Sequence, residues 1–135
     1  MDLNTVEDIV RRPPEWPGAL WRDGDAWLAG GTWLFSEPQP GLRRLIDLPA
    51  LGWRSLEVTD TGLRIAATCS MAELYAFEAP ADWAAGALFT TSCEAFLASF
   101  KVLSSATVGG NICLSLPAGP MITLTVALEA DYTLW

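Results

Sequence analysis

The chain has 135 residues, of which 51% are hydrophobic and 18% charged, and its net charge is −8. This length bounds the chain to one domain, which can be built as two lobes, and the apolar content provides a packed core and excludes a disordered chain. Because eight basic residues stand against sixteen acidic ones, we expect no nucleic acid partner, which would need a basic surface.

The first part of the chain alternates apolar runs with proline and glycine. Asn4 or Thr5 can cap a short helix through residues 9–10, which Pro13 must end. Residues 13–25 are interrupted by further prolines and glycines, so we expect them to form a loop.

Two short strands are predicted next. Residues 26–29 are an apolar run bounded by Gly30, which predicts a buried strand, and residues 43–48 are predicted to form the next strand, ending before Pro49. Between them, a helix that begins at Thr32 cannot continue past Pro38.

The middle of the chain carries clear local signals. Residues 55–59 and 63–67 alternate with period two around an Asp-Thr-Gly turn, which predicts a β-hairpin. Ser70, followed three positions later by Glu73, forms a capping box and predicts a helix over residues 71–77.

The C-terminal half is predicted to be mainly helical. Apolar positions within residues 82–99 indicate one helical region, residues 117–120 a turn, and residues 121–129 a helix that its β-branched side chains weaken. Residues 133–135 resemble the start of a strand without neighbours. We therefore expect the 135 residues to be part of a longer protein. The alternative is that they form a compact, self-sufficient small domain.

No membrane segment is expected. Residues 111–128 are rich in apolar side chains, but Pro117 and Pro120 interrupt them, which predicts a buried loop and helix. The first residues lack the basic and apolar regions of a signal peptide, so we expect a cytoplasmic location.

Cysteine and histidine usage restricts the chemistry. Cys69, Cys93 and Cys113 are widely spaced, and the chain has no histidine, so a zinc or iron–sulfur site is not expected. The three cysteines are predicted to be buried, reduced thiols. No Ser-His or Cys-His pair can form, and we predict no catalytic residue.

Two glycine pairs organise the chain. Gly30–Gly31 follow the first predicted buried strand, and Gly109–Gly110 stand just before Asn111. Glycine permits a positive φ and a close backbone approach, and successive N–H groups in such a turn suit an anion such as pyrophosphate. Each pair alone is equally consistent with an ordinary turn, and the G-x-G-x-x-G pattern is absent. Together, the pairs indicate two loops that close on one ligand.

The residues around these pairs resemble a known family. Ala-Gly-Gly-Thr at 29–32 and Ala-Thr-Val-Gly-Gly-Asn-Ile at 106–112 are similar to the two flavin-binding signatures of the molybdopterin-dehydrogenase flavoproteins. These are the FAD subunits or domains of the carbon monoxide dehydrogenase and xanthine dehydrogenase group, with the p-cresol methylhydroxylase type of FAD fold. The similarity continues between the signatures through residues 45–48, 62–67 and 71–74, in the family's order.

The resemblance implies an α+β fold of two lobes, residues 1–54 and 55–135, with the second incomplete at the C-terminus and noncovalent FAD between them. Residues 29–32 would hold the pyrophosphate through backbone amides and the Thr32 hydroxyl, while residues 107–111 would approach it from the other lobe. The predicted FAD-binding residues are Leu28, Ala29, Gly30, Gly31, Thr32, Trp33, Thr107, Val108, Gly109, Gly110 and Asn111. Of these, Leu28, Trp33 and Val108 would form walls of the site, and an equal alternative for Trp33 is a place in the core. Leu97 falls where the family often has an apolar wall, although burial in a helix face is also expected for it.

The same resemblance implies an FAD-dependent oxidoreductase component. Its role would be to pass electrons between an iron–sulfur component of a molybdenum hydroxylase and an external acceptor, with the cofactor carrying the chemistry. The iron–sulfur and molybdopterin-binding subunits would be partners.

Two departures from the family favour another class of function. Lys101-Val102-Leu103-Ser104 stand where the family usually has Gln-Ile-Arg-Asn, and Pro120 stands where it usually has an acid. Because such groups can contact the cofactor, the alternative is a structural or regulatory module that keeps the fold without FAD.

Overall fold

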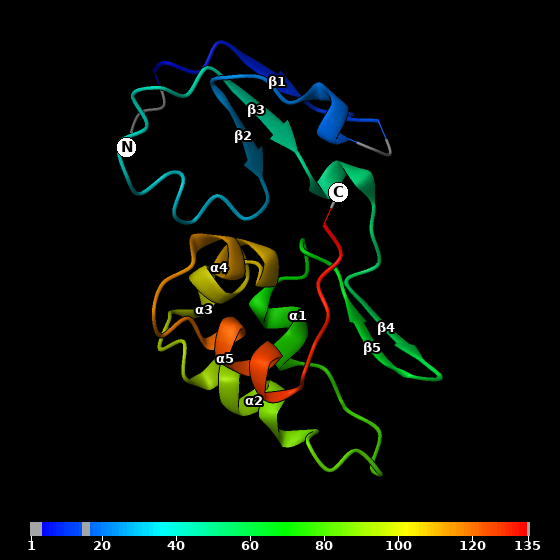
Figure 1. The fold of residues 1–135 in the computed structure, drawn as a ribbon. Coiled ribbons are helices and arrows are strands. Elements are labelled where there is room, and N and C mark those ends of the chain that lie inside the picture. Colours follow the sequence, from blue (N-terminus) through cyan, green and yellow to red (C-terminus); the bar gives the residue numbers. More distant parts are fainter. Residues whose placement is uncertain (1–3, 15–16, 135) are drawn as a thin grey trace.

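The structure is a computed structural model that describes residues 4–14 and 17–134 (Figure 1). Within them, a parallel sheet of three strands is followed by a two-stranded hairpin and five α-helices. The chain therefore has the mixed α+β architecture that the sequence predicts. In Figure 1 the sheet lies above the helices, and α4 (Val108–Leu114) is the helix drawn nearest to it.

The parallel sheet contains β1 (Asp8–Val10), β3 (Arg44–Asp47) and β2 (Asp25–Leu28), in that order. Both predicted strands are confirmed, with β3 largely buried at the centre of the sheet, but the predicted burial of β2 is wrong at Trp27, which is 37% exposed. The prediction of a helix through residues 9–10 is wrong. Ile9 pairs with Leu45 in β3, because β-branched side chains pack well on a pleated surface and a sheet edge was available.

A buried ion pair joins β2 to β3. Arg44 donates from Nε to Asp25 Oδ1 (2.9 Å) and from an Nη to Asp25 Oδ2 (2.6 Å), and the same Nη reaches the carbonyl oxygen of Leu20 (2.7 Å). The Arg22 N–H also donates to Asp25 Oδ2 (3.0 Å). These contacts fix the start of β2 and the chain before it, where a 3₁₀ turn at Pro17–Leu20 interrupts the predicted loop.

The hairpin and the capping box are confirmed. β4 (Leu56–Thr59) pairs antiparallel with β5 (Gly62–Ile65). In α1 (Met71–Tyr75), the Ser70 hydroxyl accepts from the Glu73 N–H, and the Glu73 carboxylate accepts from the Ser70 N–H. Both signals are local in the sequence, so tertiary contacts were not needed to predict them.

The helices pack around one hydrophobic core. α1 contacts α2 (Ala87–Glu94), α2 contacts α5 (Pro120–Ala127), and α5 contacts α4. The buried side chains of this core are Cys69, Met71, Leu74, Phe89, Cys93, Ala106, Val108, Met121 and Leu124.

The C-terminal half departs from prediction in three places. Leu97 lies in the connection between α2 and α3 (Phe100–Leu103), has a positive φ of 47° and is 94% exposed, so the expectation of burial in a helix face is wrong. The second glycine pair lies inside α4, where a turn was expected. Residues 131–134 form no strand, and Trp135 lies outside the described residues.

The end of the described chain returns to α5. The hydroxyl groups of Tyr132 and Thr125 share a hydrogen bond, and the Ala130 N–H donates to the carbonyl oxygen of Thr125 (2.9 Å). Among the helices that the structure describes, none combines the length and apolar character needed to cross a membrane.

Candidate functional site

A cavity of about 410 Å³ lies where the two glycine pairs meet, a size within the range of small-molecule sites. One wall comes from β2 and the turn after it, and the other from α4, the residues just before it, and Phe96 in the connection after α2. The lining residues are Trp21, Asp25, Ala26, Trp27, Ala29, Gly30, Gly31, Thr32, Trp33, Leu34, Leu48, Ala67, Phe96, Ala106, Thr107, Gly109, Gly110, Asn111, Cys113 and Leu114.

The first glycine pair forms a turn at the carboxyl end of β2. Gly31 has a positive φ of 69°, which glycine adopts without strain, and the Phe35 N–H donates to the Gly31 carbonyl oxygen (2.8 Å). The N–H groups of Gly30, Gly31, Thr32 and Trp33 donate to no described residue. The residues along this edge of the cavity therefore carry a run of unpaired backbone donors, and such groups can bind an anion.

The second glycine pair is built differently, because it lies in the first turn of α4. The Thr107 hydroxyl accepts from the Gly110 N–H (3.1 Å), and the Asn111 N–H donates to the Thr107 carbonyl oxygen (3.0 Å). The N–H groups of Val108 and Gly109 donate to the carbonyl oxygens of Cys69 (2.8 Å) and Ala67 (3.0 Å). These four amides are paired within the protein, which corrects the expectation that they form a second anion cradle.

Close backbone packing explains two of these glycines. A Cβ on Gly30 would lie 1.8 Å from the carbonyl oxygen of Ser105, and a Cβ on Gly109 would lie 2.5 Å from the Cβ of Ala67. Gly110 differs, because a Cβ there would meet only the Thr107 hydroxyl, at 2.9 Å. Because Gly110 is exposed and has no side chain, the backbone of α4 is accessible from the cavity at this position.

The polar side chains beside the glycines also differ in role. Thr107 is buried and caps α4. The Asn111 Oδ1 accepts from the Met121 N–H (3.1 Å), which caps α5 where Gly119 has no side chain to do so. Thr32 is exposed, and its hydroxyl bonds to none of the residues that the structure describes, so it is free to meet a ligand.

Two predicted wall residues do not line the cavity. Val108 is 4% exposed and packs in the hydrophobic core, and Leu28 is not among the lining residues. Sequence reasoning also missed several aromatic and apolar lining residues. They are Trp21, Trp27, Phe96, Cys113 and Leu114. The signal that could have found Trp27 is its place in the strand that leads into the first glycine pair.

The three thiols lie in two environments. Cys69 and Cys93 are buried as predicted, and burial raises the pKa of Cys69 to about 12. The prediction is wrong for Cys113, which is exposed on α4 and lines the cavity.

The positions that depart from the family lie away from the cavity lining. Lys101 and Leu103 belong to α3, and the Ser104 hydroxyl donates to the carbonyl oxygen of Phe100 (2.9 Å). Pro120 is the first residue of α5, a position that favours proline. These residues therefore have structural roles that do not depend on a ligand.

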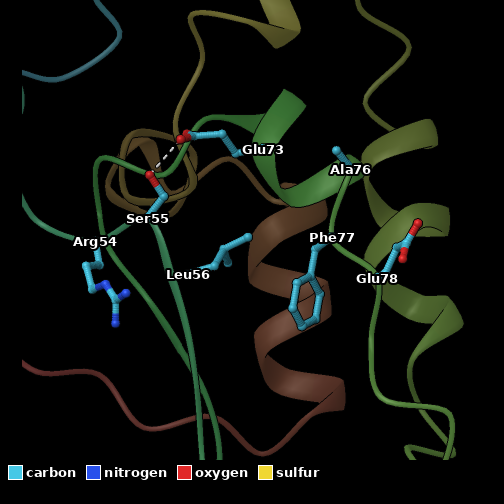
Figure 2. A pocket seen from close by; sticks show the side chains of 7 residues that line it. All are labelled: Arg54, Ser55, Leu56, Glu73, Ala76, Phe77 and Glu78. Atoms are coloured by element: carbon cyan, nitrogen blue, oxygen red, sulfur yellow. Dashed lines mark hydrogen bonds between the residues drawn. The ribbon is translucent and has the colours of Figure 1, made fainter.

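A second, open hollow lies between the start of β4 and α1 (Figure 2). Ser55 Oγ donates to Glu73 Oε1 (2.7 Å) across it, while Leu56 and Phe77 provide its apolar surface. Burial alone would raise the pKa of Glu73, but hydrogen bonds from Ser55 and Ser70 outweigh it and hold the pKa below its ordinary value. Since the Glu73 carboxylate already caps α1 and accepts a hydrogen bond from Ser55, its role here is to connect α1 to the segment before β4.

The family comparison agrees with the geometry of the cavity. A family model described as the FAD binding domain in molybdopterin dehydrogenase matches residues 20–135. The chain belongs to this family. The match includes both glycine pairs, and the cofactor of the domain is FAD. Among curated proteins, none matches the chain.

The donors along the cavity of this FAD-binding domain match the pyrophosphate group of the cofactor. Four successive unpaired amides and a free threonine hydroxyl suit the pyrophosphate, and Gly110 leaves room on the opposite wall. Membership of the family makes the chain a flavoprotein oxidoreductase component.

Proposed function

We propose that the chain holds the FAD pyrophosphate at the amides of residues 30–33, with the Thr32 hydroxyl as a further donor. The observation that carries the proposal is the run of four backbone N–H groups that donate to no described residue and border the cavity. Backbone donors can neutralise an anion without lysine, so the net charge of −8 is compatible with this role.

On this proposal, the α4 wall provides space for the ligand and no hydrogen bonds from its paired amides. Gly110 and Thr107 border the cavity, and their amide and hydroxyl groups are engaged with each other. A ligand can approach the backbone at Gly110 because no Cβ stands there. The proposed site therefore has one edge that donates hydrogen bonds and one edge where the ligand can lie close to the backbone. The two lobes predicted from the sequence would close on FAD.

The role we propose for the loaded domain is electron transfer between an iron–sulfur partner and an external acceptor within a molybdenum hydroxylase. Bound FAD would supply the redox chemistry, and the chain would bind and orient it. The iron–sulfur and molybdopterin-binding subunits are the partners that this role requires, in the cytoplasm.

Flavin content tests the proposal directly. The purified protein, incubated with FAD or FMN and freed of excess ligand, should retain FAD with its visible absorption and release it on denaturation. FMN should bind much more weakly, because a monophosphate uses fewer of the four amides. Retention of neither flavin would contradict the proposal.

One observation favours the alternative of a module that keeps the fold without FAD. The amides of residues 108–111 are all paired within the protein, so one of the two expected anion cradles is missing. The flavin-content experiment separates the two functions, since such a module would bind neither FAD nor FMN.

A further inference from the structure

Two tryptophans form an aromatic surface on the β2 wall of the cavity. Trp27 lies in β2, and Trp21 lies just before the strand. Their ring centroids are 5.2 Å apart and the planes are inclined by 30°, a stacked arrangement. Trp21 is 48% exposed and Trp27 37%, so the pair still has ring surface open to a ligand.

The chain on both sides of Trp21 is held firmly in place. Leu20 accepts a hydrogen bond from Arg44 (2.7 Å), and Arg22 donates one to the buried Asp25 (3.0 Å). The ion pair between β2 and β3 thus fixes the backbone on both sides of Trp21, and stacking on Trp27 orients the Trp21 ring in the absence of a ligand. Such preorganisation lowers the entropy cost of binding.

We propose that the Trp21–Trp27 pair is a stacking surface for one of the flat ring systems of the bound dinucleotide. This inference rests on the proposed function, which places the pyrophosphate at residues 30–33. Trp27 precedes Gly30 by three residues, at most about 10 Å along the backbone, and both line the cavity, so a ring on a sugar attached to that phosphate is within reach of the indoles. Flat heterocycles stack on tryptophan regardless of their hydrogen-bonding pattern.

The stacking surface separates an aromatic ligand from a simple phosphate. Amides alone would bind pyrophosphate and FAD through the same contacts, whereas the tryptophan pair adds affinity only for a ligand that carries a ring. Adenine and isoalloxazine share this chemistry, and ligands that contain only one of them distinguish which ring lies on the pair.

The test compares Trp21→Leu with Trp21→Phe by isothermal titration with FAD, ADP and FMN. Leucine removes the flat ring and should weaken FAD binding about tenfold, while phenylalanine keeps a ring and should retain most of the affinity. Trp53→Leu, at a half-buried tryptophan outside the cavity lining, is the matched control and should leave FAD binding unchanged. Loss of ADP affinity in Trp21→Leu identifies adenine, and loss of FMN affinity identifies isoalloxazine.

The unmutated protein provides a second readout. The indole N–H resonances of Trp21 and Trp27 should shift when FAD is added and should not shift with inorganic pyrophosphate. FAD affinity that is the same in Trp21→Leu as in the parent, or indole resonances that do not move, would overturn the inference while leaving the amide site intact. A parent protein that binds no FAD would instead contradict the proposed function.

Discussion

The two glycine pairs share the Gly-Gly dipeptide but have different structures. Gly30–Gly31 form a turn in which one residue has a positive φ and the backbone donors stay unpaired. Gly109–Gly110 lie in the first turn of a helix, have no positive φ, and donate their N–H groups to Ala67 and Thr107. The first pair offers hydrogen bonds to a ligand, and the second offers space.

This difference shows that a glycine pair can be required for distinct physical reasons. Only Gly31 needs the conformational freedom of glycine, whereas Gly30 and Gly109 are needed because another backbone segment or residue lies where a Cβ would be. At Gly110 a Cβ would lie 2.9 Å from the Thr107 hydroxyl that caps α4, so a side chain there would disturb the cap as well as fill the cavity.

The largest effect is expected from Gly30→Ala. The new Cβ would lie 1.8 Å from the carbonyl oxygen of Ser105, and backbone cannot move aside as a flexible side chain can. We expect a loss of about 3 kcal/mol in the free energy of unfolding, measured by urea denaturation. Gly41→Ala is the control, because nothing lies within 4 Å of its Cβ, and it should be close to neutral. Equal stability of the two variants would show that the walls of the cavity do not meet at Gly30.

The second pair should divide into a structural and a binding position. Gly109→Ala should lower stability by about 2 kcal/mol, because its Cβ would lie 2.5 Å from that of Ala67. Gly110→Val places a Cβ 2.9 Å from the Thr107 hydroxyl that caps α4, so it should lower stability by about 1 kcal/mol. It should also weaken FAD binding about tenfold or more, since the branched side chain enters the cavity. Both are read by denaturation and flavin titration. Unchanged FAD affinity in Gly110→Val would make Gly110 an ordinary helix residue.

The two threonines beside the pairs should show opposite effects of about equal size. Thr107→Ala removes the cap of α4 and should lower the free energy of unfolding by about 1 kcal/mol. Thr32→Ala removes an exposed hydroxyl, so stability should not change while FAD binding weakens by about 1 kcal/mol. Denaturation and flavin titration of both variants measure the contrast, and a stability loss in Thr32→Ala would contradict the proposed ligand role.

The smallest effect is expected from lowering the pH, which should destabilise the turn beside β2 and leave α4 unchanged. Hydrogen bonds from Arg44 hold the pKa of Asp25 below its ordinary value of 3.8. Because the folded pKa is the lower one, the stability that this pair contributes is complete above about pH 4 and is lost as the pH falls through the folded value. The protection of the hydrogen-bonded Arg22 and Phe35 amides against exchange, corrected for the intrinsic pH dependence of exchange, should therefore fall on acidification before that of the Gly110 amide does. The reverse order would show that Asp25 does not support the first turn.

Local signals in the sequence predicted the hairpin, the capping box and strands β2 and β3, since each depends on residues close in the chain. The strand β1 could not be predicted, because Ile9 is extended only through its pairing with β3. Likewise, the exposure of Leu97 and Cys113 depends on how the helices pack.

At the site, residue types identified both segments of the cavity but not their roles. The Gly-Gly sequence gives no sign that the amides of residues 108–111 are paired, because their acceptors include Ala67 and Cys69 on a distant segment. Asn111 was predicted to flank the ligand, yet its Oδ1 caps α5, ten positions along the chain. The tryptophan pair was missed because its members are brought together by the path of the loop before β2.

The central claim is that FAD binds through the unpaired amides of the first glycine pair. The most direct measurement is a two-dimensional ¹H–¹⁵N NMR titration of the protein with FAD, in which the amide resonances of residues 30–33 are followed beside those of residues 108–111. The account predicts large shifts for residues 30–33, toward the positions of hydrogen-bonded amides, and smaller ones for residues 108–111. Shifts confined to the hollow beside Ser55 and Glu73, or larger for residues 108–111 than for residues 30–33, would contradict it.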